Sequence, residues 1–253
     1  MRVTPIARRR EVLRLSSKCR ILSSVFMEID NVDNELVAKT SIFYIDGFNW
    51  YHSIFRLHPE WKWLNLQTFF EKLRPHDNVS EVKLFSALHS DLDARSRQEI
   101  YFNALRTLPK VKIILGVFQN RTVSCRASCR KTYSVPEEKK TDVNLAVEMI
   151  ADAVSERYEK MYVVSGDSDM QPPVEWIARN RPHIKLTVYV PAVSCEQGNR
   201  RTDYFKTKRL NVHCSFLPLD TLANHQLPNS INLGGGKFAC RPPSWKDSRL
   251  SIV

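Results

Sequence analysis

The sequence lacks the features that mark several common classes of protein. None of its apolar runs approaches the roughly 18–20 residues that a membrane-spanning helix requires, and nothing near its start reads as a secretory signal. Its six cysteines are scattered along 253 residues, without the C-x2-C pair of a zinc knuckle. We therefore expect no membrane partner, free thiols and a reducing compartment, and we predict a cytoplasmic protein.

Positive charge is abundant but unevenly distributed. The chain has 38 Lys and Arg against 27 Asp and Glu, a formal net charge of +11. Residues 1–26 hold +6 of this, and segments 121–140 and 195–210 hold +4 and +3, which leaves −2 for the rest. Charge concentrated in this way suits a polyanionic partner, so we expect the two internal segments to form a basic rim that grips a nucleic-acid backbone.

The domain organisation follows from where regular patterns occur. Residues 1–39 are expected to be a flexible or non-native basic extension. The first 26 resemble an organelle transit peptide in composition, but a disordered arm or a true start at Met27 fits equally well. Residues 40–220 are expected to form the folded domain, and 221–253 a turn-rich tail with a small hairpin around the glycines.

Apolar runs and helical spacing alternate along the domain. Strands are predicted at 41–45, 81–88, 111–118, 160–166, 184–190 and 211–219. Helices are predicted at 50–55, 66–73, 91–108, 141–158 and 173–180, while 119–136 shows no strong pattern and 197–209 reads as a basic helix or loop. Continuous apolar strands alternating with helices predict an α/β fold with a mainly parallel sheet covered on both faces.

The helix predicted at 141–158 has the clearest pattern in the chain. Thr141 is its expected N-cap. The expected buried stripe consists of Val143, Ala146, Val147, Ile150, Ala153 and Val154.

Four aspartates are expected to converge at one edge of the sheet. Asp46 follows the first strand, Asp167 and Asp169 follow the strand at 160–166, and Asp142 opens the helix before it. Ligands of open parallel sheets bind at the carboxyl ends of the strands. Each aspartate alone has an ordinary structural explanation as a turn or cap residue, but those explanations do not predict a shared location.

Such a cluster suggests a particular kind of cofactor. Hard oxygen ligands with open positions suit Mg²⁺ or Mn²⁺ better than zinc. Such an ion activates water and holds a phosphate oxygen, and two ions clamp both oxygens of phosphodiester cleavage. We predict Asp46, Asp142, Asp167 and Asp169 as metal-binding and catalytic residues.

Three motifs carry a resemblance to a known family. In this order and spacing, YIDGFNWYH (44–52), EEKKTDVNLAVEMIADA (137–153) and VVSGDSDMQPPVEWI (163–177) resemble the NYN domain family of PIN-like nucleases, in its bacterial LabA/DUF88-like branch. The resemblance covers roughly 41–219. It implies a PIN-like three-layer α/β/α domain and a metal-dependent ribonuclease that hydrolyses RNA at its aspartates.

The resemblance also implies roles for individual residues. The family's acids fall on the same four aspartates, and none of these is substituted here. Its companion Asn falls on Asn49, which would orient substrate or a metal-bound water, and Ser165 would hydrogen-bond phosphate or a ligand carboxylate. The expected RNA-binding residues on the basic rim are Arg126, Arg130, Lys131 and Lys139. Single-stranded RNA is the expected partner, and self-association is left open.

Several alternatives remain beside this interpretation. A haloacid-dehalogenase-type phosphatase needs a second acid two residues after its first-strand Asp, but Phe48 occupies that position. A non-catalytic RNA-binding or regulatory module on the same fold is the main alternative, and a nuclease acting on DNA is another.

Two further groups of residues have more ordinary explanations. The C-x3-C pair Cys125 and Cys129, with His213 and Cys214, is more typical of isolated thiols than of a zinc site. The aromatic residues Phe48, Trp50, Tyr51, Trp61 and Trp63 either stack on bases or, more in keeping with their type, pack in the core.

Overall fold

A computed structural model describes residues 40–124, 131–192, 212–217 and 221–246 of the chain. The predicted basic extension and the segment 197–209 lie outside these ranges. Within them, no helix is long and apolar enough to cross a membrane.

The centre of the molecule is a six-stranded sheet in which every strand runs parallel to its neighbours. The strand order is β3-β2-β1-β6-β7-β8. The bounds are β1 Thr40–Asp46, β2 Asn78–Ser86, β3 Val111–Leu115, β6 Lys160–Val164, β7 Lys185–Val190 and β8 Val212–Phe216. All six predicted strands are therefore present. The apolar run of β1 is fully buried because helices cover both faces of the sheet.

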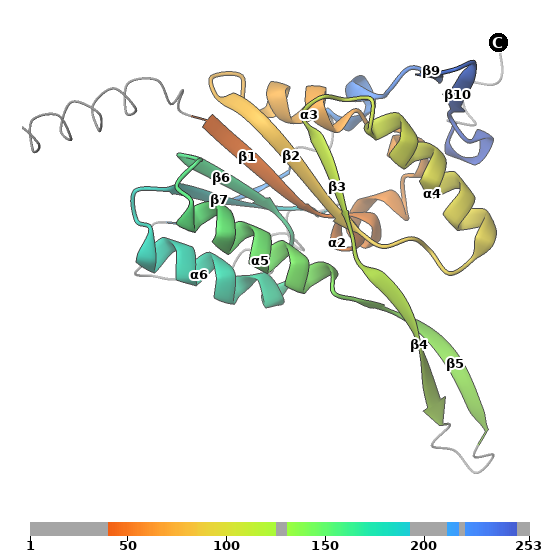
Figure 1. Ribbon diagram of the computed structural model, residues 1–253, viewed down its shortest axis with the longest axis horizontal. Coiled ribbons are helices and arrows are strands. Elements are labelled where there is room, and N and C mark those ends of the chain that lie inside the picture. The colour runs from red at the N-terminus through yellow and green to blue at the C-terminus, as the bar shows by residue number, and fades with distance from the viewer. Residues whose placement is uncertain (1–39, 125–130, 193–211, 218–220, 247–253) are drawn as a thin grey trace, which may run out of the picture. The chain divides into compact units, whose positions relative to one another are not determined.

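Helices form a layer on each side of this sheet (Figure 1). On one side lie α5 (Thr141–Val154) and α6 (Gln171–Asn180), and on the other lie α3 (Leu66–Leu73) and α4 (Leu92–Leu105). Two apolar clusters fill the two interfaces. The predicted three-layer α/β/α architecture with a parallel sheet is confirmed.

The helix after β1 begins earlier than predicted. It starts as α2 (Gly47–Trp50) and continues as a π-helical turn, Tyr51–Phe55. The early start has a local cause, because the Asp46 side chain caps the helix by accepting a hydrogen bond from the Asn49 amide at 2.9 Å. Trp50 and Ile54 then anchor this segment in the core.

The prediction for α5 was wrong in three respects. The helix ends at Val154, and its N-cap is Lys140, at a φ of 73°, not Thr141. The buried residues are Thr141, Leu145, Met149, Asp152 and Ala153, whereas Val143, Val147 and Val154 are exposed. The predicted stripe is therefore correct for Ala153, lies at the edge of the buried face for Ala146 and Ile150, and is wrong for the three valines.

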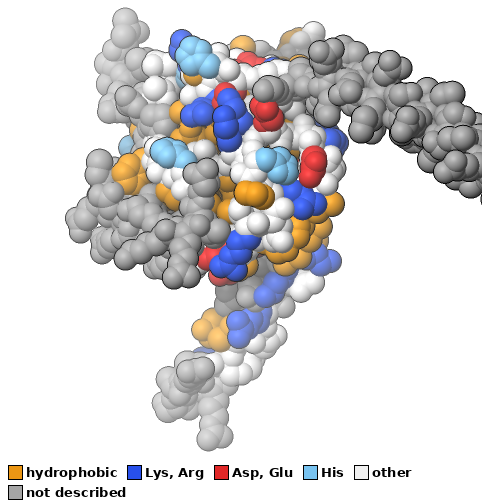
Figure 2. All heavy atoms as spheres, turned by 90° about the vertical axis from the view of Figure 1, so that its left-hand side faces the viewer, with side chains coloured by type: hydrophobic (Ala, Val, Ile, Leu, Met, Phe, Trp, Pro, Cys, Tyr) orange, Lys and Arg blue, Asp and Glu red, His pale blue; other side chains and the backbone are white. Residues whose placement is uncertain are grey.

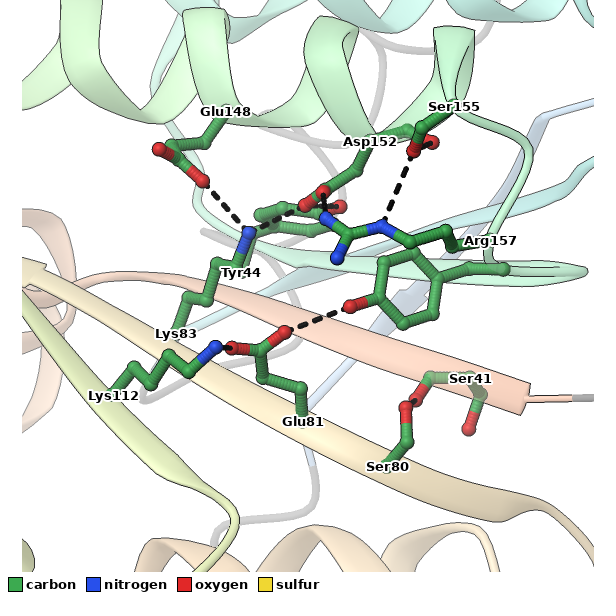
Figure 3. Close-up of polar contacts among 11 residues, drawn as sticks. Ser41, Tyr44, Ser80, Glu81, Lys83, Lys112, Glu148, Asp152, Ser155 and Arg157 are labelled. Atoms are coloured by element: carbon green, nitrogen blue, oxygen red, sulfur yellow. Dashed lines mark hydrogen bonds and ion pairs between the residues drawn. The ribbon is translucent and has the colours of Figure 1, made fainter.

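A buried ion-pair network explains why α5 turns this way (Figure 3). Asp152 faces the sheet and pairs with Lys83 Nζ at 2.6 Å and with Arg157 Nη2 at 2.6 Å. The Tyr44 hydroxyl also donates to it at 2.8 Å. Lys83 additionally pairs with Glu148 at 2.7 Å. The buried face of α5 therefore includes a charged residue. A search for apolar residues alone does not identify this face of the helix.

The segment predicted to lack a pattern contains two strands. β4 (Val117–Ser124) and β5 (Thr132–Lys139) pair in an antiparallel ribbon that projects from the body of the molecule (Figure 1). The predicted strand 111–118 divides at Gly116, where an added Cβ would lie only 2.7 Å from the Lys139 carbonyl oxygen. A ribbon that covers no core needs no alternation of apolar and polar residues, so its strands left no signal in the sequence.

The C-terminal segment packs against the same core. β9 (Ser230–Gly234) and β10 (Lys237–Cys240) form a hairpin whose turn glycines, Gly234 to Gly236, all have positive φ. Trp63 Nε1 donates to the Pro228 carbonyl at 2.8 Å. Trp245 lies 6.0 Å, between ring centroids, from Tyr101 on α4. The hairpin and Trp245 therefore extend the core on the α3/α4 side.

Candidate active site at the carboxyl end of the sheet

Asp46 is a buried carboxylate at the end of the central strand β1, with only 2% of its surface exposed. It accepts hydrogen bonds from the Asn49 amide at 2.9 Å and the Ser165 hydroxyl at 2.7 Å. Burial, together with the negative charges of Asp142 and Asp167, raises its pKa to about 7 although these two hydrogen bonds lower it. The protein therefore holds here a carboxylate that is difficult to ionise without a cation.

Ser165 and Asn49 connect the ends of β1 and β6. Besides donating to Asp46, Ser165 Oγ accepts from the Asp167 amide at 3.0 Å. The side-chain oxygen of Asn49 accepts from the Gly166 amide at 3.0 Å. Both residues fix the position of the loop after β6, which contains Asp167 and Asp169 and is here called the acidic loop, relative to Asp46. Ser165 thus contacts a carboxylate, one of the two contacts expected for it, while a role for either residue in substrate binding stays a prediction.

Asp167 and Asp169 lie in the loop after β6. Asp167 caps the 3₁₀ helix Ser168–Met170, because its Oδ1 accepts from the Asp169 amide at 3.0 Å. The loop then enters α6, whose first turn contains two prolines. Asp167 therefore combines the predicted structural role of a cap with a position beside the other acids.

Asp142 approaches the same point from the first turn of α5. Partial burial raises its pKa, and the negative charges of Asp167 and Asp169 raise it further. Since Asp46 also responds to Asp142 and Asp167, the four carboxylates share one electrostatic environment. Three segments that are distant in sequence thus bring these acids to the carboxyl end of the sheet.

A divalent ion fits the chemistry of this cluster. Within the described ranges, no Lys or Arg lies within ion-pair distance of the four carboxylates. Within the same ranges, no three acidic, His or Cys side chains lie close enough to form a ready-made coordination sphere. Mg²⁺ tolerates this arrangement, because it keeps several waters and is commonly held by one or two carboxylates together with substrate phosphates.

The predicted basic rim is described in part. Lys139 ends β5 three residues before Asp142, and Lys131 directly precedes β5; both are exposed. Figure 2, viewed from the end where β1 begins, shows Lys and Arg side chains along the projecting ribbon. Arg126 and Arg130 lie outside the described residues.

Aromatic residues next to the site were difficult to assign from sequence. Trp50 and Trp63 are buried, as expected for core residues, whereas Phe48 and Tyr51 are 47% and 41% exposed. The sequence signal for the exposure of Phe48 and Tyr51 is their spacing. Because Trp50 and Ile54 face the core, Phe48 and Tyr51 lie on another side of the helical turn.

Comparisons with known proteins identify a similar curated sequence, a similar solved structure and a matching family model. A curated relative, 6-hydroxy-3-succinoylpyridine 3-monooxygenase HspA of Pseudomonas putida (strain DSM 28022 / S16), is 28% identical over 240 residues, which cover 80% of this chain and 74% of HspA. A crystal structure of a protein of unknown function, VPA0982 from Vibrio parahaemolyticus RIMD 2210633, is similar with a TM-score of 0.46 and 17% identity, over 72% of this chain and 94% of that one. The family model described as the NYN domain matches residues 39–205. The chain belongs to the NYN domain family, whose members are nuclease-like domains that act on nucleic acids.

Proposed function

We propose that the protein is a divalent-metal-dependent ribonuclease that hydrolyses phosphodiester bonds of single-stranded RNA. The observation that carries this proposal is the convergence of Asp46, Asp142, Asp167 and Asp169 without a cationic partner in the described part of the chain. Nothing in the fold requires four mutually repelling carboxylates at one edge of a sheet. A bound Mg²⁺ or Mn²⁺ neutralises them, and NYN membership supports phosphodiester chemistry at that position.

In this proposal the residues of the candidate site have distinct roles. When bound, the ion supplies an activated water and stabilises the negative charge that develops on the phosphate. Of Asp46, Asp142, Asp167 and Asp169, one or two would bind the ion directly and the others through its waters. Ser165 and Asn49 keep the ends of β1 and β6 in register, so that Asp46 and Asp167 act together.

The ribbon β4–β5 supplies the grip on the RNA backbone. Lys139 ends the ribbon next to the site, and Lys131 adds charge further along it. Arg126 and Arg130, which precede Lys131 in the sequence, add two more cations to this segment. A strand of eight residues spans roughly 26 Å, so the ribbon can follow several nucleotides of a single strand. Contacts of this kind add affinity that depends on salt but not on sequence.

A non-catalytic RNA-binding module is the first competing function, since binding and cleavage use nearly the same residues. The similarity to HspA favours a second candidate, the hydroxylation of a small heteroaromatic ring. That reaction inserts one atom of O₂ into the ring, reduces the other to water and consumes two electrons from a reductant such as a reduced nicotinamide. The chain contains no G-x-G-x-x-G loop, so a nucleotide cofactor would have to be held in another way.

Asp167→Asn distinguishes these functions. Asparagine retains the side-chain oxygen that caps the Asp169 amide, so the fold should be preserved. Loss of metal-assisted water activation typically costs several kcal/mol of transition-state stabilisation. We therefore expect Mn²⁺-dependent cleavage of single-stranded RNA to fall by about 1,000-fold, while RNA binding persists or tightens and stability in metal-free buffer holds or rises.

The matched control is Asp93→Asn, which neutralises an exposed acid in the first turn of α4, outside the candidate metal site, and should cleave like the wild type. Cleavage by Asp167→Asn at the wild-type rate would refute the metal-site proposal. Wild-type protein that binds RNA without cleaving it would establish the binding module. Oxidation of 6-hydroxy-3-succinoylpyridine in the presence of O₂ and a reductant, without RNA cleavage, would establish the monooxygenase.

A further inference from the structure

Three rings form an exposed surface immediately after Asp46. Phe48, Tyr51 and His52, here called the aromatic ledge, lie on α2 and the π-helical turn. The ring centroids of Phe48 and His52 are 4.3 Å apart, and those of Tyr51 and His52 are 5.3 Å apart. All three residues are exposed to solvent.

The position of the ledge follows from what the rest of the turn does. Trp50 and Ile54 point into the core, and the side chain of Asn49 reaches Gly166 in the acidic loop. Phe48 and His52, one helical turn apart, occupy the neighbouring face. The ledge therefore borders the acidic loop, and its helix is capped by Asp46.

Cations lie at the far end of the ledge. Lys62 Nζ is 4.8 Å from the centroid of the Tyr51 ring, a cation–π contact. Burial lowers the pKa of Lys62, and the nearby charge of Arg97 lowers it further. Burial and the charge of Arg56 act in the same way on the pKa of His52. In the described structure, none of Arg56, Lys62 and Arg97 forms an ion pair with a carboxylate. Exposed rings thus lie beside cations that have no carboxylate partner in the described structure.

We propose that the aromatic ledge is a stacking surface for unpaired nucleobases next to the cleavage site, with Lys62, Arg97 and Arg56 binding the adjacent phosphates. This inference rests on the proposed function and specifies its substrate. Stacking on aromatic rings accepts any base but requires one of its faces to be free, which a duplex does not offer. The ledge therefore selects single strands, while the ribbon β4–β5 contributes backbone contacts on the other side of Asp142.

Metal-free binding measurements on the full chain test the ledge independently of catalysis. The probe is a mixed-sequence single-stranded RNA containing 2-aminopurine, whose fluorescence responds to stacking, titrated in the presence of a chelator. For Phe48→Ala and Tyr51→Ala we expect Kd to rise about ten-fold each, with loss of the fluorescence change on binding. Phe48→Trp should retain wild-type affinity, because a ring is restored. Lys62→Gln should reduce the slope of log K against log salt by about 0.7, the value for one contact to a single strand.

Phe238→Ala is the matched control, because Phe238 is a similarly exposed ring on the hairpin strand β10. Its affinity should not change. Binding by both ledge variants within two-fold of the wild type would overturn the proposal, as would wild-type protein that binds no single strand or prefers a duplex. If the ledge variants lose affinity but the wild type never cleaves RNA, the stacking surface stands and the nuclease proposal fails.

Discussion

Asp46 and Asp152 are equally buried, each with 2% of its surface exposed, but their surroundings differ completely. Asp152, inside the α5 interface, is held by Lys83 and Arg157 and accepts a hydrogen bond from Tyr44. Asp46, at the carboxyl end of the sheet, has among the described residues only the neutral donors Asn49 and Ser165. The chain neutralises a buried acid with its own cations at Asp152, and within the described ranges it does not do so at the candidate active site.

The same contrast separates Asp46 from Asp77 in the loop before β2. Burial would raise the pKa of Asp77, but hydrogen bonds from Lys160, Tyr162 and Arg74 outweigh it and lower the pKa to about 2. The pKa of Asp46 is about 7. Asp77 and Asp152, in the body of the domain, are thus compensated by cations of the chain, whereas the acids at the carboxyl end have no such partner in the described part of the structure.

Removing Lys83, the buried one of the two cations that pair with Asp152, should have the largest effect on stability. Lys83→Met would leave Asp152 and Glu148 without their shared partner, and breaking a buried ion pair typically costs about 3–5 kcal/mol. We expect a loss of that size in the free energy of unfolding measured with urea. Arg95→Met is the control, because Arg95 pairs with Glu99 at 2.9 Å and both side chains are nearly half exposed, and it should cost less than about 1 kcal/mol. Equal losses in the two variants would contradict the distinction between the regions.

Asp46→Asn should increase the free energy of unfolding in metal-free buffer, the opposite of the effect of Lys83→Met. A carboxyl whose folded pKa of about 7 exceeds its ordinary value of 3.8 destabilises the fold once it ionises, so wild-type stability should fall as pH rises from about 4 to 7. The variant lacks this loss, and at pH 8 we expect it to be more stable by about 2 kcal/mol. Thermal unfolding at pH 4 and pH 8 measures the difference, and an Asn variant that is less stable at pH 8 would contradict the assignment.

A smaller effect is expected for Asp77→Asn. The pKa of Asp77 is lowered from 3.8 to about 2, so its contribution is complete above pH 4 and disappears as pH falls towards 2. The variant should lose about 1–2 kcal/mol at pH 7 and almost nothing near pH 2. A loss independent of pH would show that packing, not charge, explains the role of Asp77.

The sheet and the position of the acids could be predicted because both follow from local rules. Buried parallel strands read as continuous apolar runs, and residues at their carboxyl ends meet at one edge. Asp46 and Asp167 required no more than that. The face of α5 could not be predicted, because Asp152 is inward-facing only in company with Lys83 and Arg157 from elsewhere in the chain.

The ribbon was missed, and the exposure of Phe48 and Tyr51 was left undecided, for a related reason. β4 and β5 pair with each other and cover no core, so burial imposes no pattern on them. Phe48 and Tyr51 have the composition of core residues, and only the cap at Asp46, which starts the helix early, turns them outward. The two features to which we assign RNA binding therefore lack the burial pattern from which strands and helices are predicted.

Anomalous scattering from a crystal soaked in Mn²⁺ tests the central claim most directly. The carboxylates at the end of the sheet have no cationic partner among the described residues. We therefore predict a Mn²⁺ peak in contact with at least two of Asp46, Asp142, Asp167 and Asp169, and no such peak in the Asp167→Asn variant. No peak among these residues at saturating Mn²⁺, or a peak that is unchanged in the variant, would contradict the account.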